Sequence, residues 1–530
     1  MGTLILSDLV IGILDIAFLA LLLLVINFYT RNSTLNNPLL QQLFSGGDPL
    51  LLIGIFLLLF SLKNFSGYLL SAAQYSFFYG VSSRLSKQNI QQYLQGDHIR
   101  YIHTDSSVHI RRISQQPIEF SNYILSNIQQ VISQGILICC TIIAILFYHP
   151  SLFLLLFLLL LPPVILLGYF IRKKLRHTRA STKITGEKTI QHLQESLSGF
   201  TESNIYGKND FFIDRYYKFQ QQLNDNIATQ QTLQSLPSRL IEVFAVLGFF
   251  ILIAINKWSV HTPFIDLLTI GVFMAASYKV IPGIVKILNS TGQIKTYEFV
   301  LNDLLPVAPV RSGAPVSASL SALRFEQVSF KYKQQPVLND FNFELLPGDF
   351  AGISGKSGSG KTTVINLILG FLKEESGHIY LNGQATGHLE RQHYWPGIAY
   401  VKQQPFFIND SILKNITFSD QDYDHQLLAD ALSFSGIDRM LDQYPDGLNK
   451  LITENGKNIS GGQRQRIMLA RALYRAADLF ILDEPFSEMD ETAEREMLAR
   501  LQLLAERGKM IILITHNKAS LSFCNKTVFL

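Results

Sequence analysis

Charged residues and cysteines are both scarce in this chain of 530 residues. Asp, Glu, Lys and Arg make up only 16% of the sequence and 48% of the residues are hydrophobic, a balance that argues against a purely soluble protein. The three cysteines exclude a disulfide framework and a cysteine-based metal site, because Cys139 and Cys140 are adjacent and Cys524 is distant. The net charge of +4 is small for this length, so no nucleic-acid partner is expected.

Long hydrophobic runs fill the first half of the chain. Between residues 1 and 83 the only charged side chains are Asp8, Asp15, Arg31, Asp48 and Lys63. The apolar runs exceed the roughly 20 residues that a membrane-spanning helix requires. The first run is too long for the core of a signal peptide, and we expect it to be retained. The pattern predicts six spans, at about residues 4–29, 49–81, 128–148, 151–171, 238–256 and 263–288.

Basic residues are concentrated in two of the connections between these spans. Residues 84–127 contain five Lys and Arg side chains, and residues 172–237 open with a denser basic cluster. Cytoplasmic loops of membrane proteins carry an excess of Lys and Arg, so these two connections are predicted to be cytoplasmic and the short, charge-poor ones to face outward. Both termini, and everything after the last span, are then expected in the cytosol.

A glycine-rich loop lies in the last third of the chain. The apolar run 350–354 is typical of a buried strand, and the residues after the loop, 363–371, are typical of the start of a helix. This strand, loop and helix order is the setting that a phosphate-binding P-loop needs: the loop N–H groups and the helix N-terminus face the phosphates, a lysine neutralises the β and γ oxygens, and a hydroxyl binds Mg²⁺. The predicted ATP-binding residues are Gly355, Lys356, Ser357, Gly358, Ser359, Gly360, Lys361, Thr362 and Thr363, with Thr362 also a Mg²⁺ ligand.

Two more apolar runs end in residues that could bind metal or act in catalysis. The run 479–482 is typical of a central parallel strand and is followed by Asp483 and Glu484. Asp483 is expected to hold Mg²⁺ and Glu484 to activate the attacking water, although an acidic turn before a proline is the alternative. The run 511–515 ends at His516, which is placed to reach the γ-phosphate unless it is a solvated loop residue.

A stretch rich in Pro, Ser and Ala at residues 305–321 has the composition of a linker. No internal duplication is visible, so the chain holds one copy of each half. The predicted fold is an all-α membrane domain of six helices at residues 1–304, a linker at 305–322 and a cytosolic α/β P-loop nucleotide-binding domain at 323–530.

The segment Ile459-Ser460-Gly461-Gly462-Gln463-Arg464-Gln465-Arg466 resembles the signature motif of ATP-binding cassette (ABC) transporters, with isoleucine for the leading leucine. The resemblance implies that Ser460, Gly461, Gly462 and Gln463 contact ATP bound to an opposite subunit. It also implies adenine stacking by Tyr332, sensing of Mg²⁺ and the attacking water by Gln403, an interface loop at Ser487 and Asp490, and a membrane-domain contact at Glu454. One departure from the family is that 527–530 reads as a strand and lacks the usual glycine turn and final helix.

Six spans followed by one ATPase domain is the half-transporter plan of exporter-type ABC proteins. The resemblance therefore implies a second half-transporter chain, most simply as a homodimer, in a bacterial inner (cell) membrane. It also implies that short helices near residues 96–107 and 198–211 dock on the ATPase domains, against the alternative of solvated turns.

Three lysines are candidates for a substrate cavity. Lys63 lies roughly 21 Å into the second span, where a cation needs a cavity or a partner such as Asp15. Lys279 and Lys286 are two turns apart on one face of the last span, with Pro282 between them as an expected kink. Pairing of Lys63 with Asp15, and snorkelling of the other two lysines to the headgroups, are the structural alternatives.

The runs 276–282, 193–199 and 205–208 resemble bacterial flippases of lipid-linked oligosaccharides. Such a cargo carries a pyrophosphate, which suits a basic cavity. An anionic amphiphile of this kind is the favoured cargo. A peptide or multidrug exporter, an exporter of other lipids, and a membrane-anchored ATPase that regulates without transporting remain alternatives.

Overall fold

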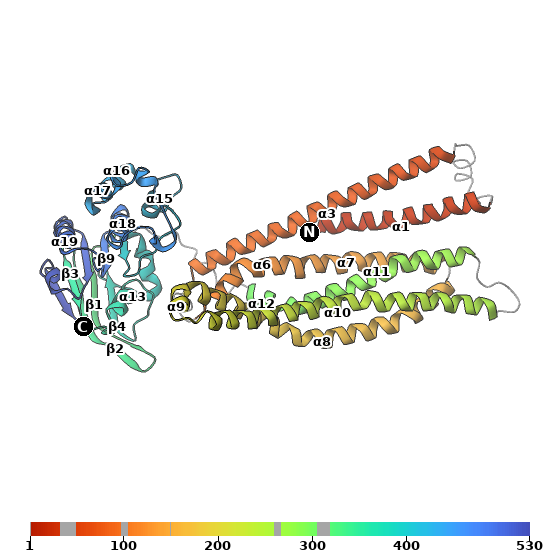
Figure 1. The fold of residues 1–530 in the computed structure, drawn as a ribbon, viewed down its shortest axis with the longest axis horizontal. Helices are drawn as coiled ribbons and strands as arrows, with labels where there is room; N and C mark the ends of the chain where they lie inside the picture. The colour runs from red at the N-terminus through yellow and green to blue at the C-terminus, as the bar shows by residue number, and fades with distance from the viewer. Residues whose placement is uncertain (1, 32–48, 97–103, 149, 259–266, 305–318) are drawn as a thin grey trace. The chain divides into compact units, whose positions relative to one another are not determined.

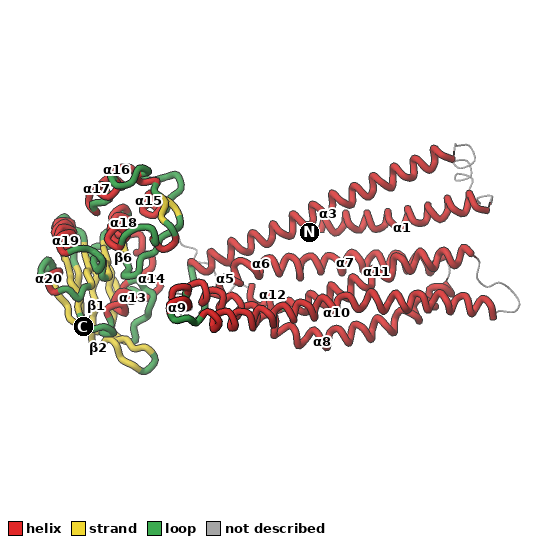
Figure 2. Tube along the Cα trace, viewed as in Figure 1, coloured by secondary structure: helices red, strands yellow, loops and turns green. Residues whose placement is uncertain are grey.

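The computed structural model describes residues 2–31, 49–96, 104–148, 150–258, 267–304 and 319–530 (Figure 1). The chain divides into a helical unit, Met1–Gly96 with Tyr101–Val310, and a second unit built on Arg311–Leu530, which is called the ATPase unit after the ATP site predicted in it. Among the described residues, Figure 2 shows helices joined by short loops in the first unit and strands only in the second. The predicted fold class, a helical membrane domain followed by an α/β domain, is confirmed.

Six long helices make up most of the described part of the helical unit. Each contains one of the predicted spans or most of it, but three are far longer than a bilayer requires. The extra length lies in the polar connections predicted to be cytoplasmic, where the helix simply continues. The six helices are α1 (Gly2–Arg31), α3 (Pro49–Leu94), α7 (Ser126–Tyr148), α8 (Pro150–Ser198), α10 (Asn209–Trp258) and α11 (Leu267–Tyr297).

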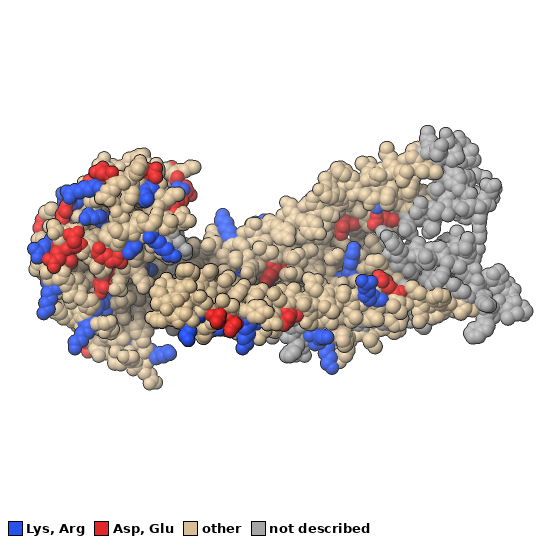
Figure 3. Space-filling view, viewed as in Figure 1, with Lys and Arg blue, Asp and Glu red and all other residues tan. Residues whose placement is uncertain are grey.

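The surface of the helical unit is poor in charge, as Figure 3 shows on the face drawn. On α3 the side chains of Leu57, Leu58, Leu62 and Phe65 are all exposed. Within the described residues, Ile53–Leu94 and Ser106–Ile143 are long and apolar enough by themselves to cross a membrane. An exposed apolar face of this kind is what lipid contact requires.

Shorter helices lie between and after the long ones. Two π-helical stretches, Arg111–Gln115 and Phe120–Leu125, interrupt the entry to α7 on either side of α6 (Gln116–Glu119). Of the two expected docking helices, α9 (Phe200–Ile205) lies in the second predicted segment. Residues 97–103 of the first segment lie outside the described residues. The remaining short helices are α5 (Ser106–Ile110) and α12 (Phe299–Leu304).

Amide side chains join three of the long helices. The Nδ2 of Asn127 on α7 donates to Gln293 Oε1 on α11 at 2.7 Å, and the Nε2 of Gln293 donates to Gln234 Oε1 on α10 at 3.1 Å. In a membrane the hydrophobic effect does not drive helices together, because the lipid tails are equally apolar. Such hydrogen bonds can therefore fix the register between helices.

A buried arginine joins the helices that precede the linker. Arg111 is 2% exposed, and its guanidinium faces Glu119 Oε2 at 3.3 Å and Glu187 Oε1 at 3.6 Å. It also donates to the Lys183 backbone oxygen at 3.1 Å, and the Lys183 ammonium lies 2.8 Å from Asp303 on α12. The end of the membrane domain is thereby fixed to α8 and to the π-helical segment by charged groups that are costly to separate.

The ATPase unit contains two main sheets. A parallel sheet has the order β11-β3-β10-β9-β6, and an antiparallel sheet has the order β2-β1-β4-β5. A short pair, β7 (Asp410–Ser411) with β8 (Leu451–Ile452), forms a third. The strands are β1 (Leu323–Tyr332), β2 (Gln335–Leu345), β3 (Phe350–Ser354), β4 (Ser376–Leu381), β5 (Gln384–Ala385), β6 (Ile398–Val401), β9 (Leu479–Asp483), β10 (Met510–Ile514) and β11 (Lys526–Phe529).

The inner strands β3, β9 and β10 of the parallel sheet are buried on both faces, which explains their unbroken apolar runs. On β10, Ile512 and Ile514 pack in the core shared with α13 and the antiparallel sheet, whereas Ile511 and Leu513 pack in the core shared with α18 and α19. The strands predicted at 350–354, 479–482 and 511–515 are confirmed to within a residue. The helices of this unit are α13 (Lys361–Ile368), α14 (His388–Arg391), α15 (Ile412–Thr417), α16 (His425–Ser435), α17 (Asp438–Leu441), α18 (Gly461–Tyr474), α19 (Glu491–Glu506) and α20 (Lys518–Leu521).

Candidate functional site

The glycine-rich loop connects β3 to α13, as the sequence predicts. Gly358 and Gly360 have φ values of +83° and +105°, a region that side chains rarely tolerate. A Cβ on Gly355 would lie 2.6 Å from the backbone oxygen of Leu530, so this position has no room for a side chain. The loop therefore keeps the shape in which its N–H groups can turn toward a phosphate.

Two polar side chains of the loop fit a bound phosphate. The Lys361 ammonium donates to the backbone oxygens of Gly355 and Lys356, at 2.9 and 3.1 Å, and so is held over the loop. The Ser359 hydroxyl is buried without a hydrogen-bond partner among the described residues. Buried polar groups are rarely left unsatisfied, and a phosphate oxygen would satisfy this one. Lys356, Ser357 and Thr362 are exposed, whereas Thr363 is buried as the third residue of α13.

Asp483 ends β9, and Glu484 follows it. Burial and the neighbouring Glu484 carboxylate raise the pKa of Asp483, against the opposing influence of Lys361 and of a hydrogen bond from Tyr400. Two adjacent acids in a half-buried place favour a bound cation. The oxygen donors of Asp483 and Thr362 are of the type that Mg²⁺ prefers, so the residues fit this metal.

Glu484 is held at both carboxylate oxygens. The Nε2 of Gln403 donates to Glu484 Oε2 at 2.7 Å, and His516 Nε2 lies 3.1 Å from Glu484 Oε1. The backbone of Glu484 has φ +49°, a left-handed conformation that costs of order 1 kcal/mol for a side chain of this kind. Three residues that are far apart in the sequence, each predicted as catalytic, thus meet at one carboxylate.

Sequence reasoning missed Tyr400. This residue pairs with Ile481 across β6 and β9, so Asp483, two residues further on, lies on the same face of the sheet. Burial, and after it the nearby Asp483 carboxylate, raise the pKa of the Tyr400 hydroxyl. The available signal was its position three residues before Gln403 in an apolar run, but a tyrosine in a strand is ordinary and only the strand pairing reveals its partner.

The signature segment begins α18. Ser460 is the N-cap of this helix: its hydroxyl accepts the Gln463 N–H at 3.3 Å, and the Gln463 side chain accepts the Ser460 N–H at 2.9 Å. A Cβ on Gly461 would lie 1.8 Å from Glu488 Oε2 and 2.9 Å from Glu488 Cβ, so a side chain here would displace the Glu488 side chain. The helix N-terminus consequently stays open at Gly461 and Gly462 as a place for an anion.

The remaining residues assigned by the family resemblance lie near α18, near α19 and at the end of β1. Ser487 accepts a hydrogen bond from Gln465 of α18 at 3.0 Å, and Asp490 caps α19 by accepting the Ala493 N–H at 2.8 Å. Tyr332 ends β1 with 48% of its surface exposed, as adenine stacking requires. The side chain of Glu454 lies outside those that the structure describes.

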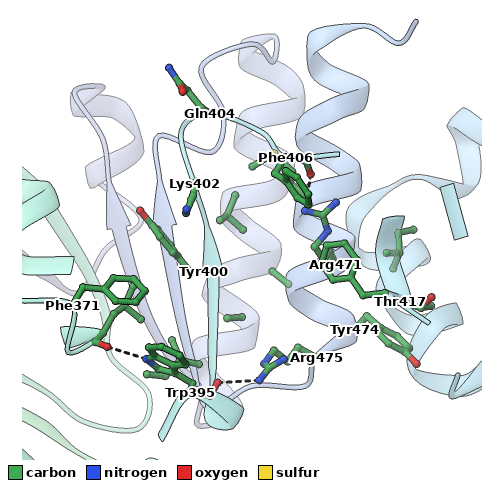
Figure 4. A pocket seen from close by; sticks show the side chains of 18 residues that line it. Phe371, Trp395, Tyr400, Lys402, Gln404, Phe406, Thr417, Arg471, Tyr474 and Arg475 are labelled. Carbon is green, nitrogen blue, oxygen red and sulfur yellow. Dashed lines mark hydrogen bonds between the residues drawn. The ribbon is translucent and has the colours of Figure 1, made fainter. Parts of the chain in front are cut away.

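A groove of about 630 Å³ runs beside β6 on the ATPase unit. Figure 4 shows its wall of aromatic rings, with Tyr400 and Trp395 on one side and Phe406 and Arg471 on the other. Arg471 lies 4.4 Å from the centre of the Phe418 ring, and burial lowers its pKa to about 10. One nitrogen of this guanidinium, Nη2, is buried without a partner among the described residues, so the groove offers an unused hydrogen-bond donor.

The three cavity lysines have different surroundings. Lys63 forms an ion pair with Asp15 of α1 and is 8% exposed, and its ammonium lies 4.8 Å from the centre of the Phe60 ring. This is the structural alternative that the sequence left open. Lys286 is exposed on α11, and the side chain of Lys279 lies outside those described.

Comparisons with known proteins agree with this site. The ABC transporter transmembrane region model matches residues 1–277, and the ABC transporter model matches residues 338–487. The chain is 34% identical over 230 residues to an ATP-dependent lipid A-core flippase of Ralstonia nicotianae (42% of this chain, 39% of that protein). It is 27% identical over 382 residues to a protein of the same name from Cupriavidus pinatubonensis (69% and 64%). The matched part thus spans less than two thirds of either relative.

A solved structure shares the fold. The structure of a bacterial Atm1-family ABC exporter with ATP bound superimposes with a TM-score of 0.82 at 16% identity, covering 100% of this chain and 93% of that one. Together with the transmembrane-region match to more than half of the sequence, this shows that the chain belongs to the ABC transporter family.

Proposed function

We propose that this chain is one half of an ATP-driven exporter or flippase of a bacterial inner membrane. The observation that carries the proposal is the meeting of Gln403, Glu484 and His516 at the end of β9, in a chain whose described residues also include six long helices. In this proposal the ATPase unit faces the cytosol, where ATP is present.

The chemistry proposed is hydrolysis of the γ-phosphate of ATP. Glu484 takes the proton of the attacking water, and Gln403 and His516 keep its carboxylate oriented. The P-loop N–H groups and Lys361 hold the phosphates. Mg²⁺, held by Thr362 and Asp483 with Gln403 beside them, would supply positive charge to the phosphate oxygens.

The same site favours a dimer. The side-chain hydrogen bonds of Ser460 and Gln463 remain within α18 and with Tyr444, which leaves the N-terminus of α18 free to meet a phosphate from another subunit. A homodimer would complete two such sites with a single kind of chain. Closure of the two ATPase units on ATP would then drive the membrane domains from inward to outward facing, and hydrolysis would reset them.

The groove beside β6 is proposed as the docking surface for a short cytoplasmic helix of the transporter. Phe200 and Ile205 on α9, and Tyr206 at its C-cap, are each at least 70% exposed, so this helix carries the apolar side chains that such a groove accepts. Its last backbone oxygens would suit the unused donor of Arg471.

The cargo proposed is an anionic amphiphile, a lipid with a phosphorylated saccharide head such as a lipid-linked oligosaccharide. The names of the relatives, ATP-dependent lipid A-core flippase, support this class. A peptide or multidrug exporter remains the alternative. ATPase activity in lipid nanodiscs tests the choice: selective stimulation by pyrophosphate-linked or phosphorylated glycolipids is expected, whereas stimulation by peptides or hydrophobic cations alone would contradict it.

A further inference from the structure

A second hollow on the ATPase unit lies where the end of α16 meets α17, α18 and α19. Its volume is about 210 Å³, and it shares no lining residue with the groove beside β6. Pockets for drug-sized ligands measure roughly 300–1,000 Å³, so this one suits a smaller ligand. We call it the arginine hollow, and its lining includes Gly436, Arg439, Gln443, Gln463, Arg466 and Glu496.

The guanidinium of Arg466 is held at this hollow by the end of α16. Its Nη1 donates to the backbone oxygen of Ser435, the last residue of that helix, at 3.0 Å. Gly436 follows with φ +68°, and a Cβ there would lie 2.6 Å from Nη1, so a side chain would displace the guanidinium. Nη1 is the only nitrogen of this guanidinium with a hydrogen-bond partner among the described residues. The other nitrogens can therefore donate to a ligand.

The charge around the arginine hollow is positive. Glu496 is the only carboxylate among the lining residues, and both of its oxygens face arginines. Oε1 pairs with Arg500, and Oε2 lies 3.9 Å from Arg439 Nη1. Arg439, Arg466 and Arg500 thus stand against a single carboxylate. An excess of positive charge in a small hollow favours an anion.

Gln463 connects the arginine hollow to the signature segment. Its Oε1 accepts the Ser460 N–H at 2.9 Å and the Tyr444 hydroxyl at 3.0 Å. The Nε2 of the same amide has no hydrogen-bond partner among the residues that the structure describes, and this side chain lines the hollow. An anion that accepts from Nε2 would hold the amide in the orientation that caps Ser460.

We infer that the arginine hollow is a second anion site, which binds inorganic phosphate or a small phosphate monoester and stabilises the first turn of α18. The planar guanidinium groups of Arg439 and Arg466 match the spacing of phosphate oxygens. The side-chain amides of Gln443 and Gln463 add neutral donors. Binding of the anion is independent of transport, whereas the importance of its effect on α18 rests on the proposed ATPase function.

The first experiment measures phosphate binding while the ATP site is filled. The full chain with Glu484→Gln is placed in phosphatidylcholine nanodiscs with saturating Mg²⁺ and ATP, which keeps free phosphate out of the P-loop. Inorganic phosphate is titrated by calorimetry against chloride at equal ionic strength. We expect saturable binding by the parent. Arg439→Gln should weaken it by about 10-fold, because one charge-assisted hydrogen bond is lost.

Arg439 is the better residue to change because its side chain is 77% exposed, whereas Arg466 also caps α16. Arg495→Gln is the matched control. Arg495 is exposed on α19, beside Glu496 in sequence but outside the lining of the hollow, so its replacement removes the same charge and should leave phosphate binding unchanged. The absence of saturable binding by the parent would overturn the inference. Equal affinities in the two variants would also overturn it, because they would show only a general effect of charge.

The same nanodiscs prepared with phosphatidic acid separate a free anion from a lipid headgroup. Free phosphate should bind in neutral nanodiscs, where phosphatidic acid is absent. Stabilisation of the chain by phosphatidic acid, without binding of free phosphate, would assign the arginine hollow to a lipid and overturn the inference.

The second experiment follows the effect on α18 by hydrogen–deuterium exchange. Phosphate should slow the exchange of the backbone N–H groups in residues 460–466 by at least about 2-fold in the parent, because the capped turn opens less often. Arg495→Gln should respond as the parent does, and Arg439→Gln should not respond at the same phosphate concentration. Unchanged exchange in the parent with phosphate bound would overturn the proposed effect on α18.

Both experiments are separable from the proposed function. They measure phosphate binding and backbone exchange, so a failure to find any lipid cargo leaves them intact. Conversely, lipid-stimulated ATPase activity in a chain that binds no phosphate beside its ATP would retain the transporter and reject the anion site.

Discussion

Gln403 and Glu484 lie 2.7 Å apart, nitrogen to oxygen, although 81 residues separate them in the sequence. The amide donates to one oxygen of a carboxylate whose other oxygen faces His516 at 3.1 Å. A base held at both oxygens is oriented before water arrives, which lowers the reorganisation needed for proton transfer. The first prediction concerns this carboxylate.

Glu484→Gln should bind ATP but hydrolyse it at least about 100-fold more slowly, because the amide cannot accept the proton of the attacking water. Steady-state ATPase activity and ATP affinity, both measured in nanodiscs, show whether hydrolysis is lost while ATP binding is retained. Glu506→Gln, at the exposed end of α19, is the control and should behave as the parent. Near-normal hydrolysis by Glu484→Gln would remove Glu484 from the role of base.

Lys361→Ala should weaken nucleotide binding itself, by about 10-fold or more, since a charge-assisted contact to phosphate is lost. Equilibrium binding of a fluorescent ATP analogue is the measurement. Lys373→Ala, an exposed lysine after α13, removes the same charge outside the loop and should bind normally. Retained affinity in Lys361→Ala would mean that the loop does not hold the phosphates in the way described.

The ion pair between Lys63 and Asp15 should be structural. Lys63→Met and Asp15→Asn each leave one charged partner in a largely buried place, so each should lower the melting temperature in nanodiscs. The double variant removes both charges and should recover most of the loss. If Lys63→Met instead lowered only substrate-stimulated ATPase activity and left stability intact, Lys63 would belong to the cargo cavity.

Glu374 and Arg391 form a partly buried pair in the ATPase unit, 2.7 Å apart, with Arg391 fully buried. Glu374→Gln should destabilise the unit by about 3 kcal/mol near neutral pH, because Arg391 then loses its counter-charge. Thermal unfolding measures the difference. Glu375→Gln, which breaks an exposed pair with Lys331, is the control and should cost at most about 1 kcal/mol.

The effect of Glu374 should depend on pH. Burial acts to raise the pKa of Glu374, but hydrogen bonds from Arg391 and the backbone outweigh it and the net pKa is lowered from 4.5. A carboxylate with a lowered folded-state pKa stabilises the fold above 4.5 and loses this contribution as the pH falls through the folded-state value. The stability gap between parent and Glu374→Gln should therefore narrow below pH 4.5. A gap that stayed constant to lower pH would argue against the charged pair.

Much of the fold was readable from the sequence because apolar runs dominate it. The runs around Ile481 and Ile512 predicted buried parallel strands, and the six long hydrophobic runs predicted the six long helices. The lengths of α3, α8 and α10 beyond the predicted spans were not predicted, because the hydropathy signal ends where the bilayer would end while the helix hydrogen bonding continues.

The site was predictable only where a motif stands in one stretch of chain. Lys361 and Glu484 each follow a strand in sequence, so their places were expected. The place of Tyr400 was not expected, because Asp483 lies on another strand and only the parallel pairing of β6 with β9 puts the two residues on the same face of the sheet. The sequence likewise left open whether Lys63 forms an ion pair or lines a cavity. The answer depends on how α1 and α3 pack, because Asp15 lies on one helix and Lys63 on the other.

The most direct test of the transporter account is ATP-dependent flipping in proteoliposomes. Lipids with a fluorescent phosphorylated-saccharide head are placed in both leaflets, and a membrane-impermeant quencher reports which leaflet holds them as ATP is added. The account predicts ATP-dependent movement of these lipids by the parent chain and none by Glu484→Gln. Steady ATP hydrolysis without movement of these lipids, of peptides or of hydrophobic cations would contradict it and favour a membrane-anchored ATPase that does not transport.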